Sequence, residues 1–239
     1  MGLHPNIATA AFLIADPARS AMLMALLDGR ARPAGDLAFA AGVTAQTASA
    51  HLGKLRDGGL LTVETQGRHR YYRLAGPHVA DALEHLAAIQ PPGPVRRRPP
   101  SREARALRFA RCCYDHLAGQ LGLAVAEALQ ARDILRPAAD KRYVLTPAGV
   151  AWCAGLGLRV ADLRPGRHGL VHACLDWTER EHHLAGPLAT ALMRVLCAQG
   201  WLRRAETGRA VQVTPKGWIA LRTELGLDPA SCGGARERP

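Results

Sequence analysis

The chain has 239 residues, a length that accommodates two or more domains. Lys and Arg total 31 against 20 Asp and Glu, so the net charge of +11 favours a polyanionic partner. Aromatic residues are 5% of the chain, too few to favour stacking on single-stranded nucleic acid. No apolar run approaches the length of a membrane span, and the first residues do not resemble a signal peptide. We therefore expect a cytoplasmic protein whose six cysteines are reduced.

Three helices are predicted before residue 42. Residues 4–28 suit two helices, and Asp16 begins the second with Pro17 in its first turn. Residues 36–41 form a third, short apolar segment, and Gly42 supplies the tight turn expected after it. The residues predicted to face the core from this segment are Leu37, Ala40 and Ala41.

A fourth helix is predicted to start after Thr44, which is a good N-cap. Its apolar positions Ala48, Leu52 and Leu55 are spaced four and three apart, so one stripe faces a core. Small polar residues near the start of such a helix can approach base edges in the major groove. The residues predicted to contact DNA from this segment are Thr44, Gln46, Thr47, Ser49, Ala50, His51 and Lys54.

A β-ribbon is predicted next. Gly58 and Gly59 end the helix, and residues 60–64 and 71–74 are rich in β-branched and aromatic residues, as strands are. The basic turn between these strands suits contacts with phosphates or the minor groove. Its predicted DNA-contacting residues are Gln66, Arg68, His69 and Arg70. This order of helices, strands and turns is typical of a winged helix-turn-helix, so the sequence predicts DNA binding.

Four short motifs connect this stretch to a known family. They are TASAHLGKL at residues 47–55, Gly59-Leu60-Leu61, Gly67-Arg68, and Tyr72-Arg73-Leu74. With them the chain, over about residues 4–90, resembles the ArsR/SmtB family of bacterial winged-helix repressors. The resemblance implies a homodimer that binds a palindromic operator and leaves it when an inducer binds. It also implies base contacts from Gln46, Thr47 and Ser49, a wing contact from Arg68, and dimerisation through the first helix and a helix over residues 77–89.

The resemblance does not supply the inducer. Metal-sensing members carry a Cys-x-Cys pair at the start of the reading head, and residues 35–41 contain no cysteine. The other common site of the family uses Asp-x-His together with His-x-x-Glu on the last helix. The acidic and histidine residues of the corresponding helix do not reproduce those spacings; they are His78, Asp81, Glu84 and His85.

A linker rich in proline and arginine is predicted over residues 91–101. Five prolines fall within residues 90–100, and such a segment cannot continue a helix. It separates a DNA-binding and dimerisation domain, residues 1–90, from an effector or dimerisation domain, residues 102–227. Residues 228–239 are predicted to be a disordered tail. The predicted fold class is mainly α with small β-hairpins (α+β).

The second domain contains an internal repeat. Residues 113–119 are echoed by residues 174–186 with an insertion, and Leu121 then matches Leu188 at an offset of 67. We interpret each copy as a helix, a second apolar helix, and two strands closed by Thr-Pro-x-Gly, which caps another helix. The prediction is two degenerate winged-helix-like units whose helices are too apolar to read bases. An all-helical sensor domain with two hairpins is the alternative.

Candidate sensor residues gather at the starts of the two copies. Thiolate, carboxylate and imidazole recur there as Cys-x-Asp followed by His, a set that suits a borderline or soft metal ion. The predicted metal ligands are Cys113, Asp115, His116, Cys174, Asp176 and His183. A pseudo-twofold arrangement would bring both sets together across one pocket. The alternatives are packing alone, or a redox pair of Cys113 and Cys174 if their Cα atoms lie within about 7 Å.

The sequence therefore predicts a homodimeric transcriptional regulator that binds double-stranded DNA. In the simplest interpretation it is a repressor, and an effector bound in its C-terminal domain releases it from the DNA. A metal- or thiol-responsive sensor that uses the Cys/His clusters is one alternative, and an inducer-free architectural DNA-binding protein is another. The cofactor that the sequence suggests is a metal ion. The sequence contains no nucleophile elbow, no phosphate-binding Gly-Lys-Ser/Thr and no His-Glu-x-x-His, so no enzyme is predicted.

Overall fold

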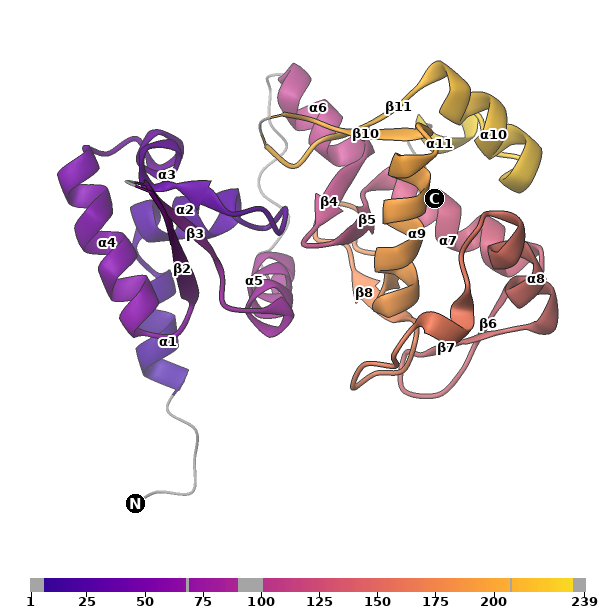
Figure 1. The fold of residues 1–239 in the computed structure, drawn as a ribbon, viewed down its shortest axis with the longest axis horizontal. Coiled ribbons are helices and arrows are strands. Elements are labelled where there is room, and N and C mark those ends of the chain that lie inside the picture. Colours follow the sequence, from indigo (N-terminus) through magenta and orange to yellow (C-terminus); the bar gives the residue numbers. More distant parts are fainter. Residues whose placement is uncertain (1–6, 68, 90–100, 207, 234–239) are drawn as a thin grey trace. The chain divides into compact units, whose positions relative to one another are not determined.

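The computed structural model describes residues 7–67, 69–89, 101–206 and 208–233 (Figure 1). The chain divides into two compact units, Met1–Leu83 and Glu84–Pro239. The division falls inside helix α5 (Pro77–Ile89), ahead of the domain boundary predicted at residue 90. The predicted linker over residues 91–101 lies, apart from its last residue, outside the described residues.

The first unit is a winged helix-turn-helix, as predicted. Its three strands form an antiparallel sheet in the order β1-β3-β2. In chain order its elements are α1 (Ile7–Ile14), α2 (Pro17–Ala25), β1 (Arg32–Pro33), α3 (Ala34–Ala41), α4 (Ala45–Asp57), β2 (Leu61–Gln66), β3 (His69–Leu74) and the start of α5. Across the described residues no single helix is long and apolar enough to span a bilayer; α1 and α2 together meet that test but are bent by 89° where they join.

The helix boundaries of the first unit follow from local capping. The Asp16 side chain accepts a hydrogen bond from the Arg19 backbone N–H at the start of α2. Gly42 adopts φ 64° and ends α3, as the sequence predicts. The face that α3 buries differs from the prediction, because Ala38 is buried beside Leu37. Ala40 is exposed and Ala41 is half-buried, since both lie on the outer side of this single short helix.

The wing is longer than the sequence predicts. Its strands run to Gln66 and from His69, and these two residues pair with each other. Gln66, His69 and Arg70 of the predicted five-residue turn therefore belong to the strands. Gly67 has a φ of 62°, which a two-residue hairpin turn requires. Strand β1, which the sequence analysis did not predict, adds Arg32 beside Tyr72 of β3.

The second unit repeats the order hairpin, helix, hairpin, helix. After α6 (Arg102–Phe109), the first round is β4 (Arg111–Cys113), β5 (His116–Ala118), α7 (Gln120–Ala131), β6 (Leu135–Pro137), β7 (Tyr143–Leu145) and α8 (Pro147–Gly155). After the 3-10 helix η1 (Val160–Asp162), the second is β8 (His172–Leu175), β9 (His182–Ala185), α9 (Pro187–Ala198), β10 (Leu202–Arg204), β11 (Val211–Val213) and α10 (Pro215–Leu225). A short helix, α11 (Pro229–Gly233), follows.

Each round begins with a hairpin, so the prediction of a helix at that point is wrong. In the first hairpin Tyr114 adopts a φ of 57°, a left-handed conformation that turns the chain back after three strand residues. In the second, the Asp176 carboxylate accepts hydrogen bonds from the backbone N–H groups of Thr178 and Glu179. Local side-chain bonds of this kind favour turns over helix.

The two rounds contact each other reciprocally at the backbone. Arg111 of β4 forms a bridge with Ala210, next to β11, and Arg142, next to β7, forms a bridge with His172 of β8. In the sequence repeat, residue 111 corresponds to 172 and residue 142 to 210. Each bridge therefore joins the first hairpin of one round to the region of the second hairpin of the other round.

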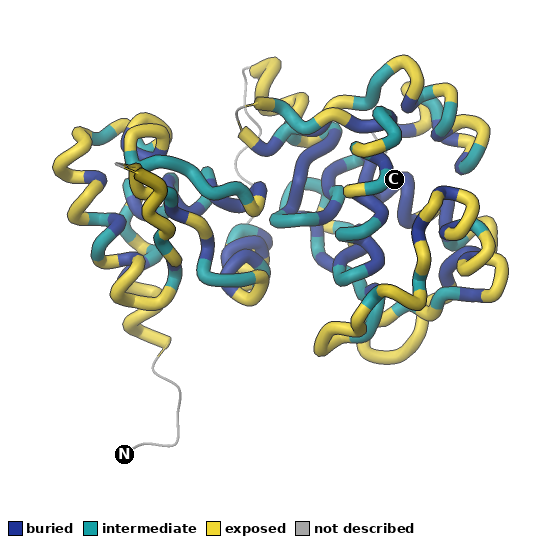
Figure 2. The backbone as a smooth tube through the Cα atoms, viewed as in Figure 1, coloured by how far each residue is buried: buried dark blue, intermediate teal, exposed yellow. Residues whose placement is uncertain are grey.

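The core of the second unit lies around α7 and α9. Figure 2 shows α7 as an almost continuously buried helix, and Leu121 and Leu129 are among its buried residues. The last helix, α11, contributes Cys232, which is 4% exposed and belongs to the same core. Residues 229–233 are therefore helical where the sequence predicts a disordered tail, and Cys232 packs against this core. The remaining residues of the predicted tail, 234–239, lie outside the described residues.

The Thr-Pro-x-Gly segments cap α8 and α10 as predicted. Thr146 and Thr214 accept hydrogen bonds from the backbone N–H groups of Gly149 and Gly217. The glycines also permit close approach of the backbone, because a Cβ at Gly217 would lie 2.0 Å from the carbonyl oxygen of Trp201.

We expect Gly217→Ala to lower the free energy of unfolding by at least about 1–3 kcal/mol, since backbone cannot move aside as a side chain can. Chemical denaturation of the full chain measures this change. Gly155→Ala in α8 is the matched control, because a Cβ there meets nothing within 4 Å. Equal stability of the two variants would contradict the prediction.

Candidate functional site

The candidate reading surface is the outer face of α4. Ala48, Leu52 and Leu55 are fully buried at 0% exposure, as predicted, and they anchor the helix on the rest of the first unit. The opposite face is open to solvent. Five of the residues predicted to contact DNA are exposed there: Gln46, Thr47, Ser49, Ala50 and Lys54.

The other two residues predicted to contact DNA from this segment are Thr44, whose side chain caps the helix, and His51, which is only partly exposed. The Thr44 hydroxyl accepts from the Thr47 backbone N–H at 3.2 Å and lies 2.9 Å from the Thr47 hydroxyl, so it organises the start of the helix. His51 is half-buried, and its Nδ1 is buried without a hydrogen-bond partner among the described residues. Of the two, Thr44 is the exposed one.

The wing presents a second polar surface. Gln66, His69 and Arg70 are all exposed, and Arg70 pairs across the ribbon with Thr65. Arg68, the predicted wing contact, lies outside the described residues. Side chains at such a ribbon tip are free to meet phosphates or a minor groove.

A second candidate site is a buried cluster in the C-terminal unit. The potential ligand atoms of Cys113, His116, Cys174 and His183 all lie within 4.8 Å of one another, and all four residues are buried. They come from β4, β5, β8 and β9. Cys113 is directly opposite His116 in one hairpin, and Cys174 is directly opposite His183 in the other. We call these four residues the Cys/His cluster.

The two carboxylates predicted as ligands lie behind the imidazoles. The Nε2 atoms of His116 and His183 face each other at 3.2 Å. The Nδ1 of His116 is 3.1 Å from the Asp115 carboxylate, and the Nδ1 of His183 is 3.5 Å from the Asp176 carboxylate. Each ring therefore has one nitrogen toward the cluster and the other toward a carboxylate.

The protonation of the cluster follows from this geometry. Burial opposes charge on His116, but the Cys113 sulfur and the Asp115 carboxylate outweigh it and raise the pKa of His116. Burial and the adjacent His116 lower the pKa of His183 well below its usual value. At 3.2 Å the two Nε2 atoms are close enough to share a hydrogen bond, in which one ring donates and the other accepts. A hydrogen bond with Cys174, together with burial, raises the pKa of the Cys113 thiol.

Asp176 is held by a buried arginine that the sequence analysis missed. The guanidinium of Arg111 donates to Asp176 at 2.8 Å, and both side chains are 0% exposed. Arg111 also lies 4.9 Å from the centre of the Trp177 ring. Although burial opposes its charge, Arg111 keeps the pKa of Asp176 well below its usual range. Arg111 belongs to no recognisable sequence motif, and its partner Asp176 is 65 residues away. The spacing of residues therefore does not predict this ion pair.

Neighbouring residues fall on the other side of the hairpins. Cys112 precedes Cys113 but belongs to the large apolar core, and its Sγ contacts the carbonyl of Tyr114 at 3.4 Å. Successive strand residues face opposite sides, which explains the separation. In the charged run over residues 179–183, Glu179 pairs with Arg108 at 2.8 Å and His183 is fully buried.

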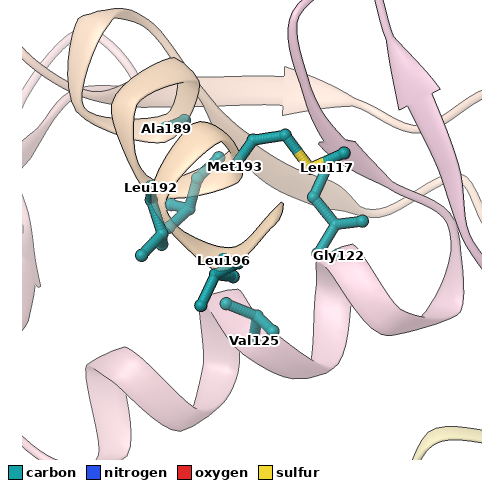
Figure 3. Close-up of a pocket in the computed structure, with 8 residues that line it drawn as sticks. Leu117, Gly122, Val125, Ala189, Leu192, Met193 and Leu196 are labelled. Atoms are coloured by element: carbon teal, nitrogen blue, oxygen red, sulfur yellow. The ribbon is translucent and has the colours of Figure 1, made fainter. Parts of the chain in front are cut away.

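An apolar pocket lies between α7 and α9 (Figure 3). Within the part of the chain that the structure describes, glycine and apolar residues line it and offer no charged or hydrogen-bonding side chain to a ligand. Its lining includes Leu117, Val125, Leu192, Met193 and Leu196.

Comparisons with known proteins identify relatives of this chain. The family described as "Helix-turn-helix domain" matches residues 14–64. CmtR, an HTH-type transcriptional regulator of Mycobacterium tuberculosis, is 43% identical over 76 residues, which are 32% of this chain and 64% of CmtR. Among solved structures, the homodimeric winged helix-turn-helix domain of a possible ArsR-family regulator from Mycobacterium bovis is 29% identical. It covers 37% of this chain and 89% of its own, with a TM-score of 0.32.

A further relative extends over nearly the whole chain. The HTH-type transcriptional regulator YdfF of Bacillus subtilis is 41% identical over 225 residues, which are 94% of this chain and 99% of YdfF. The similarity therefore includes the C-terminal unit as well as the reading head. The chain belongs to the family of winged helix-turn-helix transcriptional regulators, as its resemblance to the ArsR/SmtB repressors predicts.

Proposed function

We propose that this regulator is a homodimeric, cytoplasmic repressor that places α4 in the major groove of a palindromic operator and the wing on the flanking backbone. The observation that carries the proposal is the exposed polar face of α4, supported from behind by a fully buried stripe. A helix anchored in this way presents its N-terminal residues to base edges without moving. The proposed role is recognition and regulation, and no catalytic step belongs to it.

Exposed apolar side chains support the proposed homodimer. Ile7 and Phe12 of α1 are 78% and 71% exposed, and Leu86 and Ile89 of α5 are 47% and 75% exposed. These are the two helices to which the family resemblance assigns dimerisation. Burial of such residues in a second copy would remove apolar surface from water.

We infer that the C-terminal unit contains two related, degenerate winged-helix-like copies and that it receives the effector. The repeated element order, the paired Thr-Pro caps and the reciprocal bridges support the first inference. For the effector, the chemistry of the Cys/His cluster is more specific than that of the apolar pocket, because the pocket lacks polar groups to orient a ligand.

The base-reading role of α4 predicts a change of preference in one variant. Sites for the full chain are first selected from a random pool of duplex DNA. Gln46→Ala should then lose discrimination at particular base pairs of each half-site by about 1–3 kcal/mol, since a side chain that reads a base edge contributes that much. Competition binding against single-base variants of the selected site measures the loss.

Arg70→Ala in the wing is the contrasting variant. It should weaken binding to all sequences alike and reduce the slope of log affinity against log salt by about 1, as the loss of one phosphate contact does. The proposal is wrong if Gln46→Ala keeps the base preferences of the unmodified chain, or if the selected sites contain no inverted repeat.

A further inference from the structure

The Cys/His cluster has the ligand types and spacing of a tetrahedral metal site. Zinc–nitrogen bonds of about 2.0–2.1 Å and zinc–sulfur bonds of about 2.3 Å place two ligand nitrogens about 3.3 Å apart and two sulfurs about 3.8 Å apart. The Nε2 atoms of His116 and His183 are 3.2 Å apart, and all four potential ligand atoms lie within 4.8 Å of one another. Modest adjustments of side chains would therefore complete the coordination.

The surroundings of the cluster favour a doubly charged ion. Two thiolates balance a charge of +2, so the occupied centre is neutral inside a buried region. The residues packed with the two cysteines are Ala118 and Ala185, which supply no polar atom from their side chains. Polar side chains in such an apolar setting require partners, and a shared ion satisfies all four at once.

The carboxylates behind the rings complete the arrangement. A metal-bound histidine donates its other N–H to a carboxylate or carbonyl, which fixes the tautomer and the orientation of the ring. Asp115 occupies this position at the Nδ1 of His116, and the Asp176 carboxylate lies 3.5 Å from the Nδ1 of His183, which makes no hydrogen bond among the described residues. Asp176 is itself held in place by Arg111 and by the Gly119 backbone N–H at 2.7 Å. The Nε2 atoms are therefore the ones aimed at the ion.

We propose that the C-terminal unit binds one Zn²⁺-type ion through Cys113, His116, Cys174 and His183, with Asp115 and Asp176 orienting the two imidazoles. All four ligands come from the protein, so no position stays open for a substrate, as in structural and regulatory sites. The ion connects the first hairpin of one copy to the first hairpin of the other. This proposal does not depend on which DNA sequence the regulator reads.

Cobalt titration of the full chain tests the proposal. The chain is purified under reducing conditions, treated with chelator and titrated with Co²⁺, whose thiolate-to-metal absorption reports cysteine ligands. We expect one equivalent of Co²⁺ per chain, displaced by one equivalent of Zn²⁺. Cys113→Ser and Cys174→Ser should each weaken binding by more than about 100-fold, beyond what the loss of an orienting residue costs.

Cys112→Ser is the matched control, because this neighbouring thiol faces the apolar core and should leave the cobalt spectrum unchanged. Asp115→Asn is a second test variant that we expect to fold, since the Asp115 side chain is 39% exposed. It should keep the spectrum and weaken Co²⁺ binding by about 10–100-fold. The proposal is overturned if the reduced, folded chain binds no stoichiometric Co²⁺, or if Cys112→Ser weakens binding as much as Cys113→Ser. Formation of a Cys113–Cys174 disulfide in place of metal uptake would also overturn it.

Discussion

Arg111→Met is expected to lower the free energy of unfolding of the full chain by about 3–5 kcal/mol. The substitution keeps an unbranched apolar stem but removes the cation that balances Asp176, and both members of this pair are fully buried. An uncompensated carboxylate would then remain in a region of low polarity. The guanidinium also donates to Thr178 and lies over the Trp177 ring, so those contacts disappear as well. Equilibrium denaturation with guanidinium chloride measures the change.

Arg108→Met is the matched control for this prediction. Arg108 also pairs with an acidic residue of the second hairpin, Glu179, but its side chain is 56% exposed. Exposed ion pairs contribute at most about 1 kcal/mol, so this variant should stay close to the unmodified chain. If Arg111→Met lowers the free energy of unfolding no more than Arg108→Met does, the buried pair contributes no more to stability than the exposed one, and the prediction is wrong. The double variant with Asp176→Asn should lose less than the sum of the two single changes, because neither partner is then left alone.

Adding Zn²⁺ to the reduced, chelator-treated chain is expected to raise its free energy of unfolding by about 4 kcal/mol when free Zn²⁺ exceeds the dissociation constant 1,000-fold. The reason is that the four ligands of the Cys/His cluster come together in the folded state, so the ion stabilises that state selectively. For a chain of this size the gain corresponds to a rise of about 8–16 °C in the unfolding midpoint. Thermal unfolding followed by circular dichroism, at several fixed free Zn²⁺ concentrations, measures it.

Two cysteine variants separate site-specific stabilisation from general metal effects. Cys112→Ser should show the full rise, and Cys174→Ser should show almost none. If all three proteins respond equally, the stabilisation comes from elsewhere on the chain. The comparison is internal, since each variant is measured with and without the ion, and a variant that starts less stable still reports its own response.

Prediction from the sequence worked best where structure is decided locally. The buried stripe of α4 follows from apolar residues spaced four and three apart, and the caps at Thr44, Thr146 and Thr214 follow from side chains that bond to backbone three residues on. The same holds for the turn at Gly42. The six-residue candidate set for a metal site came from a local pattern that occurs twice, and it stays a prediction.

Prediction was weaker where long-range contacts decide the outcome. The hairpins β4–β5 and β8–β9 were read as helices, since strands of three or four residues carry too little periodicity to distinguish the two. Spacing alone did not separate the residues whose polar atoms converge, Cys113 and His116, from Asp115 behind them. That distinction depends on which strand positions face the other copy. Arg111 was missed for the same reason, because its role depends on a partner in the other copy.

The cross-strand placement of the cluster has a consequence for the folding pathway. Each hairpin holds its cysteine directly opposite its histidine, and a slip of one residue in the pairing would turn one of them to the opposite face. Two independent strand alignments must therefore both be right before four ligand atoms can converge. The absorption of bound cobalt would therefore report, during refolding, when both hairpins have reached the correct pairing. Its colour should develop with the slower of the two alignments and should be absent from molecules in which either hairpin is misaligned.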